Sequence, residues 1–499
     1  MGQAAALTLA PDSREAASSL ARMQFTSLEQ WLYSQEAGCM DLSGVELGEE
    51  LRGRELLRLL LQAHVDSRGD GYVGPSIEVF ENGSPENHVV YSRKRMQERK
   101  VVTLFGEIRV CRFGYGIRGG MSIHPLDEQL RLPGRLYSYE LQRRLVRKAV
   151  CGPFDEAICA LREATGVKMP KRTAEDILVD ASYDFDSFYA RRQGDQADET
   201  GPILVGSIDC KGIPMIKSEL SSRKVRRGKG EKAQKKKMAC VAAVFTIEPR
   251  IRTPEEVVES LFNPDEARKK RGKRSRPQGK RVWASLEAGK DSFIGDVNEE
   301  MKRRDPNSKK TRVVVTDGER AIQIRVMRII GDAVLVLDLL HVLEKLWAAG
   351  HALYGEGTRE AEEFVRERTL RILRGGVSQV VKGLRQIVTK RKLKGTKREK
   401  LCGVANYLYK NRSRMRYDEY LAKGLPIASG SVEGACKNLI KDRMERSGMR
   451  WGSEMAEAMV KMRAIYLSGD LDEYWDYHVA QDQSRLYPKN RWKPKIASS

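Results

Sequence analysis

The sequence predicts an α+β protein of several domains, built around a mixed α/β core whose strands end in acidic residues. Short apolar runs rich in β-branched residues stop at Asp209 and at Asp317, and such runs are typical of buried strands. A long charged block, residues 342–424, contains no proline and has helical periodicity, which indicates an all-helical insertion. The N-terminal part adds helices and a small β-hairpin.

The composition favours a nucleic-acid partner. The chain has 499 residues, enough for about two to four domains. Its 90 Lys and Arg outnumber its 68 Asp and Glu, which gives a net charge of +22. Such an excess indicates a polyanionic partner, because each phosphate that a cation neutralises releases counterions. Solubility or ribosome association are the alternative explanations.

Cysteine spacing and hydropathy argue against several other classes of protein. The 8 cysteines are scattered and form no Cys-x-x-Cys pair, so we expect neither a zinc ribbon nor a disulfide framework, as in a reducing cytosol. No apolar run reaches the length of about twenty residues that a membrane helix needs. The first residues include Asp12, Arg14 and Glu15 and lack a long apolar core, so no signal peptide is expected.

The first two predicted domains precede the core. Residues 1–86 are expected to be helical, with residues 1–24 frayed, and residues 87–192 combine a hairpin with helices as a DNA-binding domain. The hairpin should turn at 105–107. Its polar face, with Arg109 and Arg112, is either exposed to solvent or in contact with the DNA backbone. Helices over 139–150, 154–165 and 172–189 fit a helix-turn-helix reader or a plain three-helix bundle. The candidate DNA-binding side chains there are Arg143, Arg144, Arg147 and Lys148.

The core is predicted at 200–341 and 425–480, split by the helical insertion, and a polar tail follows at 481–499. Its first strand ends at Asp209, Lys211-Gly212 makes a turn to a second strand, and the apolar run at 238–247 should be a central strand. Two basic runs, 223–237 and 268–281, either track a DNA backbone or are solvated loops. The cations of the first run that we expect on DNA are Arg226, Arg227, Lys235, Lys236 and Lys237.

The order of these elements is that of an RNase H-like fold. Three strands come first, then helix, strand, helix and strand, then the helical block and a helix carrying Glu433. The first and fourth strands of such a sheet are neighbours, so Asp209 and Asp317 can approach each other. Carboxylates suit Mg²⁺ or Mn²⁺, and two such ions can activate the attacking oxygen and stabilise the leaving one at phosphorus. Taken singly, Asp317-Gly318 is also a common turn pair, and Glu433 could merely compensate a helix dipole.

Four motifs resemble those of DDE transposases of bacterial insertion sequences, chiefly the ISKra family and more distantly the mutator-like transposases. They are Ser207-Ile-Asp209-Cys-Lys-Gly, Val315-Thr-Asp317-Gly-Glu-Arg-Ala, Leu337-Asp338-Leu-Leu-His341-Val and Ser429-Gly-Ser-Val-Glu433-Gly-Ala. The resemblance implies that Asp209, Asp317 and Glu433 bind two Mg²⁺ or Mn²⁺ ions as catalytic ligands. It also implies that Asp338 and His341 belong to the catalytic set, with His341 near the scissile phosphate.

Alternatives to these roles remain open. His341 could be a locally bonded histidine at a helix start, and Asp338 is the second choice for the third metal ligand. Other glutamates that compete with Glu433 are Glu344, Glu363 and Glu445. Glu433 is preferred because it follows a loop of small residues and because Lys437 and Lys441, on its helical face, suit phosphates. Similar transposases can carry paired cysteines after the hairpin, whereas only Cys111 stands here, so no zinc site is expected.

The resemblance implies an enzyme, a DNA transposase that moves a mobile element by recombination. It would bind the ends of its own insertion sequence and catalyse Mg²⁺-dependent cleavage and strand transfer. The implied partners are double-stranded DNA, at the element ends and the target, and further copies of the chain in a homodimer or higher oligomer. The implied location is the bacterial cytoplasm, at the nucleoid. The alternatives are another RNase H-like DNA nuclease or integrase, and a non-catalytic DNA-binding protein derived from a transposase.

Overall fold

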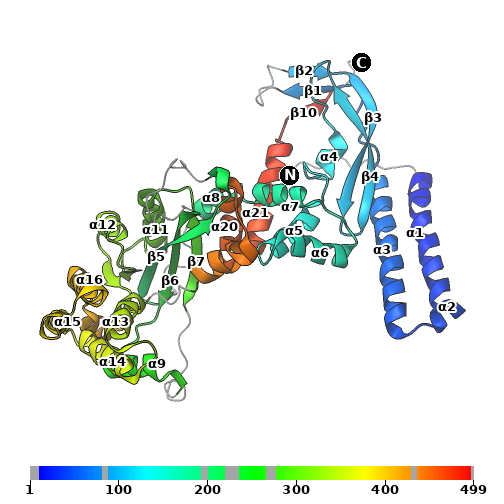
Figure 1. The fold of residues 1–499 in the computed structure, drawn as a ribbon. Coiled ribbons are helices and arrows are strands. Elements are labelled where there is room, and N and C mark those ends of the chain that lie inside the picture. Colours follow the sequence, from blue (N-terminus) through cyan, green and yellow to red (C-terminus); the bar gives the residue numbers. More distant parts are fainter. Residues whose placement is uncertain are drawn as a thin grey trace. The chain divides into compact units, whose positions relative to one another are not determined.

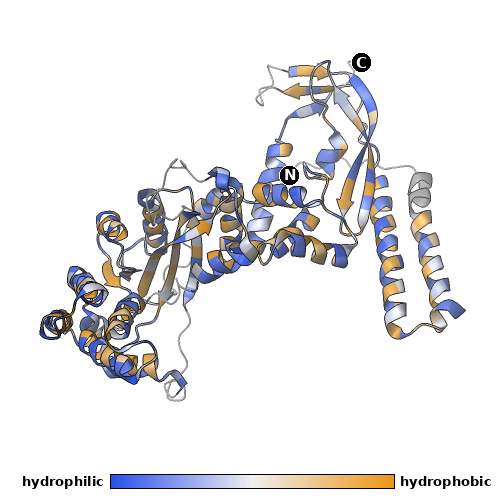
Figure 2. Ribbon diagram, in the orientation of Figure 1, coloured by the Kyte–Doolittle hydropathy of each residue, from blue (hydrophilic) through white to orange (hydrophobic). Residues whose placement is uncertain are grey.

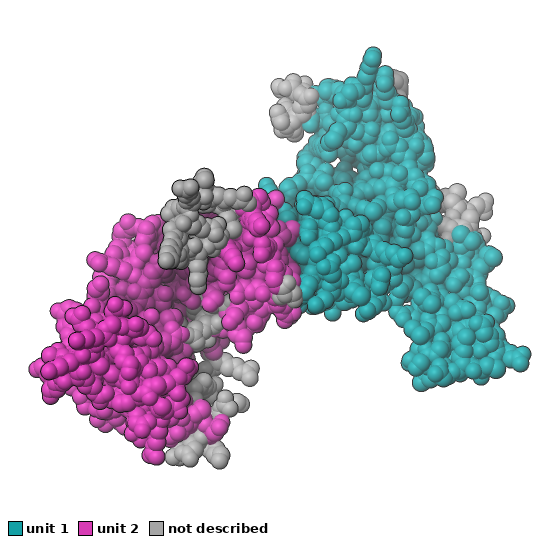
Figure 3. All heavy atoms as spheres, in the orientation of Figure 1, with its two compact units in different colours: residues 1–184, 471–499 teal, residues 185–470 magenta. Residues whose placement is uncertain are grey.

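The computed structural model describes residues 11–80, 88–192, 200–219, 235–265, 277–428, 434 and 436–495. The chain forms two compact units (Figure 3), one of residues 1–184 with 471–499 and one of residues 185–470. The predicted domain limits differ from this division at the C-terminus. Helix α21 (Leu471–Leu486), predicted among the final helices of the core, belongs to the first unit.

The first unit begins with a helical hairpin, in which α1 (Pro11–Leu32) lies along α3 (Leu42–Asp66) with the short α2 (Gln35–Gly38) between them (Figure 1). The expected fraying of residues 1–24 is wrong from Pro11 onward, because the alanine-rich segment favours helix. Asp41 caps α3 by accepting the Gly44 N–H at 2.8 Å, which satisfies one of the unpaired donors at the start of the helix.

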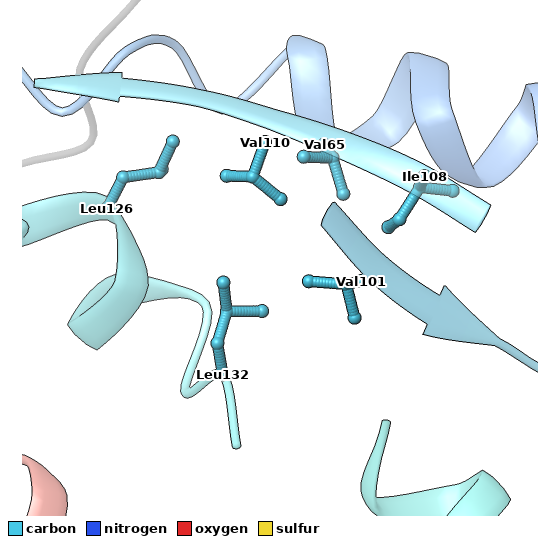
Figure 4. Packing of buried hydrophobic residues seen from close by; sticks show 6 residues of the cluster. All are labelled: Val65, Val101, Ile108, Val110, Leu126 and Leu132. Atoms are coloured by element: carbon cyan, nitrogen blue, oxygen red, sulfur yellow. The ribbon is translucent and has the colours of Figure 1, made fainter. Parts of the chain in front are cut away.

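Two small sheets follow in the same unit. The predicted hairpin is present as β3 (Arg93–Thr103) and β4 (Gly106–Gly116), and Thr103 pairs with Gly106, so the turn lies slightly earlier than expected. Its buried face joins α3 and α4 (Pro125–Gln129) in an apolar cluster (Figure 4) formed by Val65, Val101, Ile108, Val110, Leu126 and Leu132. The other sheet has the order β10-β1-β2, with β1 (Ile77–Phe80), β2 (His88–Tyr91) and β10 (Trp492–Pro494). The polar tail, expected to end loosely, therefore supplies a strand.

Arg112 does not lie on a wet face of the hairpin. It is buried at 8% exposure and forms an ion pair with Asp127 at 2.6 Å, and Arg99 binds the same carboxylate at 2.9 Å. Arg109, in contrast, is 61% exposed. Of the two hairpin arginines proposed to face DNA, only Arg109 is therefore placed to do so.

Three helices pack together after the hairpin, namely α5 (Tyr139–Ala149), α6 (Phe154–Thr165) and α7 (Lys171–Ala181). The third helix ends at Ala181 rather than continuing to 189, and α8 (Phe185–Arg191) opens the second unit. Helix α21 joins this bundle through Asp184, which accepts hydrogen bonds from His478 and Arg485.

The second unit contains a five-stranded mixed sheet of order β7-β6-β5-β8-β9. Strand β6 is antiparallel to β5 and β7, whereas β8 is parallel to β5 and to β9. The strands are β5 (Ile203–Pro214), β6 (Lys236–Ile247), β7 (Gln278–Ser285), β8 (Thr311–Thr316) and β9 (Val334–Leu337). Figure 2 shows how hydrophobic these strands are.

Two predictions about this sheet are wrong. The predicted turn at Lys211-Gly212 is absent, because β5 continues through both residues and pairs with β6 from Ile203 to Pro214. The apolar run at 238–247 forms the interior strand β6, as predicted, with β5 and β7 on either side, whereas the third strand in the sequence is β7, at the end of the second basic run. The cation at that end, Arg281, is buried rather than available to DNA.

Helices complete the second unit. Helix α11 packs on β5 and β6, and Gly206 allows its close approach, since a β-carbon there would lie 3.1 Å from the Met301 sulfur. The described part of the predicted insertion is entirely helical, and α20 packs against β7. The helices of the unit beyond α8 are α9 (Pro254–Phe262), α11 (Lys290–Arg304), α12 (Arg320–Ile329), α13 (Leu339–Tyr354), α14 (Arg359–Leu373), α15 (Val377–Lys390), α16 (Gly395–Asn411), α17 (Tyr417–Ala422), α19 (Asp442–Met444) and α20 (Ser453–Ser468). Short helical turns are η2 (Lys217–Glu219), η3 (Arg412–Arg414), η4 (Cys436–Lys441) and η5 (Arg446–Gly448).

None of the helices in the described ranges is long and apolar enough to cross a membrane.

Candidate active site

The sheet of the second unit brings Asp209 and Asp317 to the same edge. Strands β5 and β8 are adjacent and parallel, and their last paired residues are Ile208 and Thr316. The next residue of each strand is an aspartate, and both are half-buried. Because parallel strands hold equivalent residues about 4.8 Å apart, the two carboxylates leave the sheet side by side.

The surroundings of Asp317 disfavour its negative charge. Burial raises the pKa of Asp317, and the neighbouring charge of Asp209 raises that pKa further. The Glu319 backbone N–H, which donates to Asp317 at 2.9 Å, and the charge of His341 act in the opposite direction. The net effect is a raised pKa of Asp317, so the protein compensates the negative charge of Asp317 incompletely, and an added cation beside it would favour that charge.

Asp338 holds His341 in place. Its carboxylate is 0% exposed and accepts hydrogen bonds from the Leu340 N–H at 3.0 Å, as the cap of α13, and from His341 Nδ1 at 3.0 Å. Its own backbone N–H donates to Thr316 at the end of β8. These bonds place the Asp338 carboxylate where it orients His341; its role as the second choice for the third metal ligand stays a prediction.

His341 is positively charged at neutral pH. The hydrogen bond that His341 donates to Asp338 raises the pKa of His341 to about 9, against the opposing effect of burial, and the charges of Asp338, Glu344 and Asp317 add to the rise. The ring is 28% exposed, so the side of the imidazolium away from Asp338 can meet an anionic ligand.

This charge predicts a pH dependence of stability in the metal-free protein. Because the folded pKa of His341, about 9, exceeds the ordinary 6.5, its contribution is fully present below pH 6.5 and is lost as the pH rises through 9. The loss should be of order 2–3 kcal/mol, at about 1.4 kcal/mol per pKa unit with some solvent screening. Urea unfolding at pH 6.5 and 9.5 measures it, and a His341→Gln protein that loses as much stability over this range would contradict the assignment.

The insertion helix α16 closes over the loop that carries Asp317. A β-carbon at Gly318 would overlap the ring of Tyr407, and Gly318 has no positive φ, so the glycine is needed for close approach and not for a turn. Gln323 donates to the Asp317 carbonyl at 3.2 Å and to Asn411 at 3.0 Å. Helix α16 thus holds this loop through Tyr407, which packs on Gly318, and through Asn411, which binds the Gln323 side chain that donates to the Asp317 carbonyl.

Gly318→Ala should therefore destabilise the protein. Forcing a methyl group against the Tyr407 ring is expected to cost about 1–3 kcal/mol, and combining it with Tyr407→Leu should recover part of that cost. The matched control is Gly295→Ala in α11, where a β-carbon meets nothing within 4 Å and alanine favours helix by about 0.5–1 kcal/mol. Thermal unfolding of the four proteins measures these effects, and a Gly318→Ala protein as stable as the control would contradict the proposed contact.

The third predicted metal ligand, Glu433, lies outside the described residues, as do Arg226 and Arg227. The competing glutamates are placed differently: Glu363 pairs with Arg359, Glu445 pairs with Lys236, and Glu344 is exposed one turn beyond His341. Among the residues that the structure describes, no group of three or more His, Cys, Asp or Glu side chains could hold a metal ion.

The predicted DNA-binding cations differ in their availability. Three of the four on α5 are paired with acids of the same unit: Arg143 and Arg144 with Glu140, and Arg143 and Arg147 with Asp472. The fourth, Lys148, is exposed. In the second unit, Lys235, Lys437 and Lys441 are exposed, Lys236 is exposed and paired with Glu445, and Lys237 is half-buried.

Several residues around the site were not predicted from the sequence. Glu319, beside Asp317, forms an ion pair with Lys290 at the start of α11. Tyr407 lies near enough that burial and the charges of Asp317, Asp338 and Glu344 raise its pKa. Glu319 stands in the Asp317 motif and could have been noticed, whereas nothing in the local sequence signals Tyr407.

No protein-family model matches the chain, and no curated protein matches its sequence. Its function is therefore inferred from the sheet, the two aspartates and the charged groups around them.

Proposed function

We propose that this chain is a DDE-type DNA transposase, which binds the ends of its own insertion sequence and catalyses Mg²⁺-dependent DNA cleavage and strand transfer. The observation that carries this proposal is the pair Asp209 and Asp317, which lie side by side where the parallel pairing of β5 with β8 ends. The sheet order β7-β6-β5-β8-β9, with β6 alone reversed, supports an RNase H-like core. The helical segment between β9 and the last helices supports the same assignment.

The donor set fits a hard divalent cation. Asp209 and Asp317 offer carboxylate oxygens, which Mg²⁺ and Mn²⁺ prefer, and their mutual repulsion, with burial, raises the pKa of Asp317. We propose Glu433 as a further ligand. Two bound ions would activate the attacking oxygen and stabilise the leaving one in phosphodiester chemistry.

The other charged residues of the site would act on the DNA. The imidazolium of His341, held by Asp338, would donate a hydrogen bond to a phosphate oxygen and orient the scissile group. Lys437 and Lys441, both exposed on η4, would bind phosphates near it. The net charge of +22 would support binding along an extended stretch of duplex.

Strand transfer separates this function from its alternatives. The protein is incubated with Mg²⁺, a labelled duplex carrying the sequences that flank its gene, and a supercoiled plasmid. A transposase joins the labelled end to the plasmid. We propose that two or more copies of the chain assemble on the DNA, at the nucleoid in the cell, but this readout does not depend on either point. Cleavage without joining would indicate another RNase H-like nuclease, and binding without cleavage would indicate a non-catalytic DNA-binding protein; either result contradicts the proposal.

The lysines on η4 give a prediction about DNA affinity. Replacing Lys437 and Lys441 together with glutamine should weaken binding to every DNA sequence and reduce the slope of log K against log salt concentration by about 2, roughly one for each phosphate contact. Fluorescence anisotropy over a range of KCl concentrations measures the slope. The control is Lys302→Gln on α11, where the lysine pairs with Glu299; equal slopes in all three proteins would exclude the contacts.

A further inference from the structure

Two cysteines face each other across strands β5 and β6, next to the candidate active site. Cys210 and Cys240 are directly opposite in the antiparallel ladder, and their sulfur atoms are 3.7 Å apart. Both are free thiols. Cysteine spacing in the sequence gives no sign of this pair, because 30 positions separate its members.

The ladder geometry at this pair suits a covalent bond. The Pro202 carbonyl accepts from Thr311 and so faces β8. Because backbone groups alternate along the unbroken register of β5, Cys210 also turns its backbone groups toward β8, which is the pattern of a non-hydrogen-bonded pair with β6. The α-carbons of such a pair are about 4.5 Å apart, within the range of about 4.4–6.8 Å that disulfides require. The two sulfur atoms of a disulfide are about 2.05 Å apart. The sulfur atoms of Cys210 and Cys240, now 3.7 Å apart, would therefore have to approach each other by less than about 2 Å.

The pair is accessible from one face of the sheet. Cys210 is half-buried and Cys240 is 7% exposed. Side chains alternate along a strand, so Cys210 shares the face of Gly206, which lies under α11, and Asp209 belongs to the opposite face. Because Cys210 is half-buried, part of its side chain is accessible to an oxidant, on the face opposite to that of Asp209.

We propose that Cys210 and Cys240 form a dithiol site, which peroxides and other two-electron oxidants convert into a cross-strand disulfide. With hydrogen peroxide, the thiolate of one cysteine attacks the O–O bond and becomes a sulfenic acid, releasing the first water after proton transfer. The second thiol then attacks that sulfur, the S–O bond breaks, the S–S bond forms and a second water leaves. The two thiols lose two electrons and two protons, and one peroxide is reduced to two waters.

The disulfide would also affect the proposed cleavage reaction, and this part rests on the proposed function. Asp209 immediately precedes Cys210, so drawing β5 toward β6 displaces the backbone that positions the carboxylate. A displacement of about 1 Å at a catalytic group can cost about 100-fold in rate. We expect the oxidised protein to cleave DNA at least about tenfold more slowly than the reduced protein, with recovery after treatment with dithiothreitol.

The chemical test does not depend on activity. The full-length protein is treated with hydrogen peroxide, alkylated, digested without reduction and analysed by mass spectrometry. A linked pair of peptides containing Cys210 and Cys240 is expected, together with alkylated Cys39, Cys111, Cys151 and Cys159, which are exposed. Separate alkylation of Cys210 and Cys240, or pairing of either with another cysteine, would overturn the proposal.

Cys240→Ser provides the matched variant, and circular dichroism checks that it folds. Its DNA cleavage should resist peroxide, whereas that of the wild type should fall and be restored by the thiol. If the disulfide forms and cleavage is unchanged, the effect on Asp209 is refuted while the dithiol site stands. If the reduced wild type does not cleave DNA at all, the proposed function fails and the mass-spectrometric result still decides on the dithiol site.

Discussion

Replacing Asp317 with asparagine is expected to lower Mg²⁺-dependent DNA cleavage by about 10³-fold or more and to leave DNA binding intact. The carboxylate stands beside Asp209 at the edge of β5 and β8, where we propose that both hold the metal. Metal ions contribute several kcal/mol of transition-state stabilisation, and each 1.4 kcal/mol is about tenfold in rate. Single-turnover cleavage of a labelled duplex, with affinity measured in parallel, tests this; cleavage at the wild-type rate would contradict the proposed role.

The same substitution should not destabilise the metal-free protein. The pKa of Asp317 is raised above its ordinary 3.8, so the folded protein binds that proton more tightly than the unfolded chain. Its contribution to the free energy of unfolding therefore falls as the pH rises from 3.8 through the folded pKa, and asparagine removes this cost. At pH 7 the metal-free variant should melt at or above the wild-type temperature. Added Mg²⁺ should raise the melting temperature of the wild type more than that of the variant, because the variant binds the ion more weakly.

Replacing Glu300 with alanine is expected to destabilise the second unit by about 3–5 kcal/mol, the usual cost of leaving buried cations without their partner. Glu300 lies on α11 with 8% of its side chain exposed, and it pairs with Arg281 of β7 and with Arg303 and Arg304. Arg281 is held further by stacking at 3.5 Å from the centre of the Tyr189 ring. The cluster thus ties α11 to β7, and the substitution removes the carboxylate that the three guanidinium groups share.

The pKa of Glu300 also sets the lowest pH at which Glu300 stabilises the protein. Burial opposes its ionisation, but Arg281, Arg304 and Arg303 lower the pKa of Glu300 from 4.5 to about 2. Its contribution is therefore present above pH 4.5 and is lost as the pH falls through 2. The matched control is Glu299→Gln, the next residue, which is 66% exposed and paired only on the surface with Lys302; we expect a change within about 0.5 kcal/mol. Urea unfolding of both variants tests this, and equal stabilities would refute the role of the cluster.

Hydrophobic periodicity and turn residues in the sequence predicted many of the helices and strands. The hairpin at β3 and β4, the helical insertion and the strands that contain Asp209 and lead to Asp317 follow from periodicity and turn residues, although β5 does not end at Asp209 but continues to Pro214. The prediction of a turn at Lys211-Gly212 was wrong. This pair is typical of a turn, but Gly212 lies inside β5 against the side chain of Lys236. Strand β7 was missed because its buried residues, Arg281 to Ala284, follow directly on a basic run.

Long-range contacts could not be predicted in this way. From the sequence, Arg112 and Arg281 are expected to be exposed cations. The fold instead buries them against the carboxylates of Asp127 and Glu300. The approach of Tyr407 to Gly318 likewise depends on the packing of the insertion against the sheet. Such contacts set burial and pKa, and a charge pattern alone carries no information about them.

Binding of Mn²⁺ to the metal-free protein, followed by the loss of the free Mn²⁺ signal in electron paramagnetic resonance, tests the claim that Asp209 and Asp317 form a divalent-cation site. Saturable binding is expected for the wild type and for Glu299→Gln, with competition by Mg²⁺. Asp209→Asn and Asp317→Asn should each weaken binding at least about tenfold, as loss of a ligating carboxylate implies. Equal binding of Mn²⁺ by Asp317→Asn and the wild type would contradict the claim.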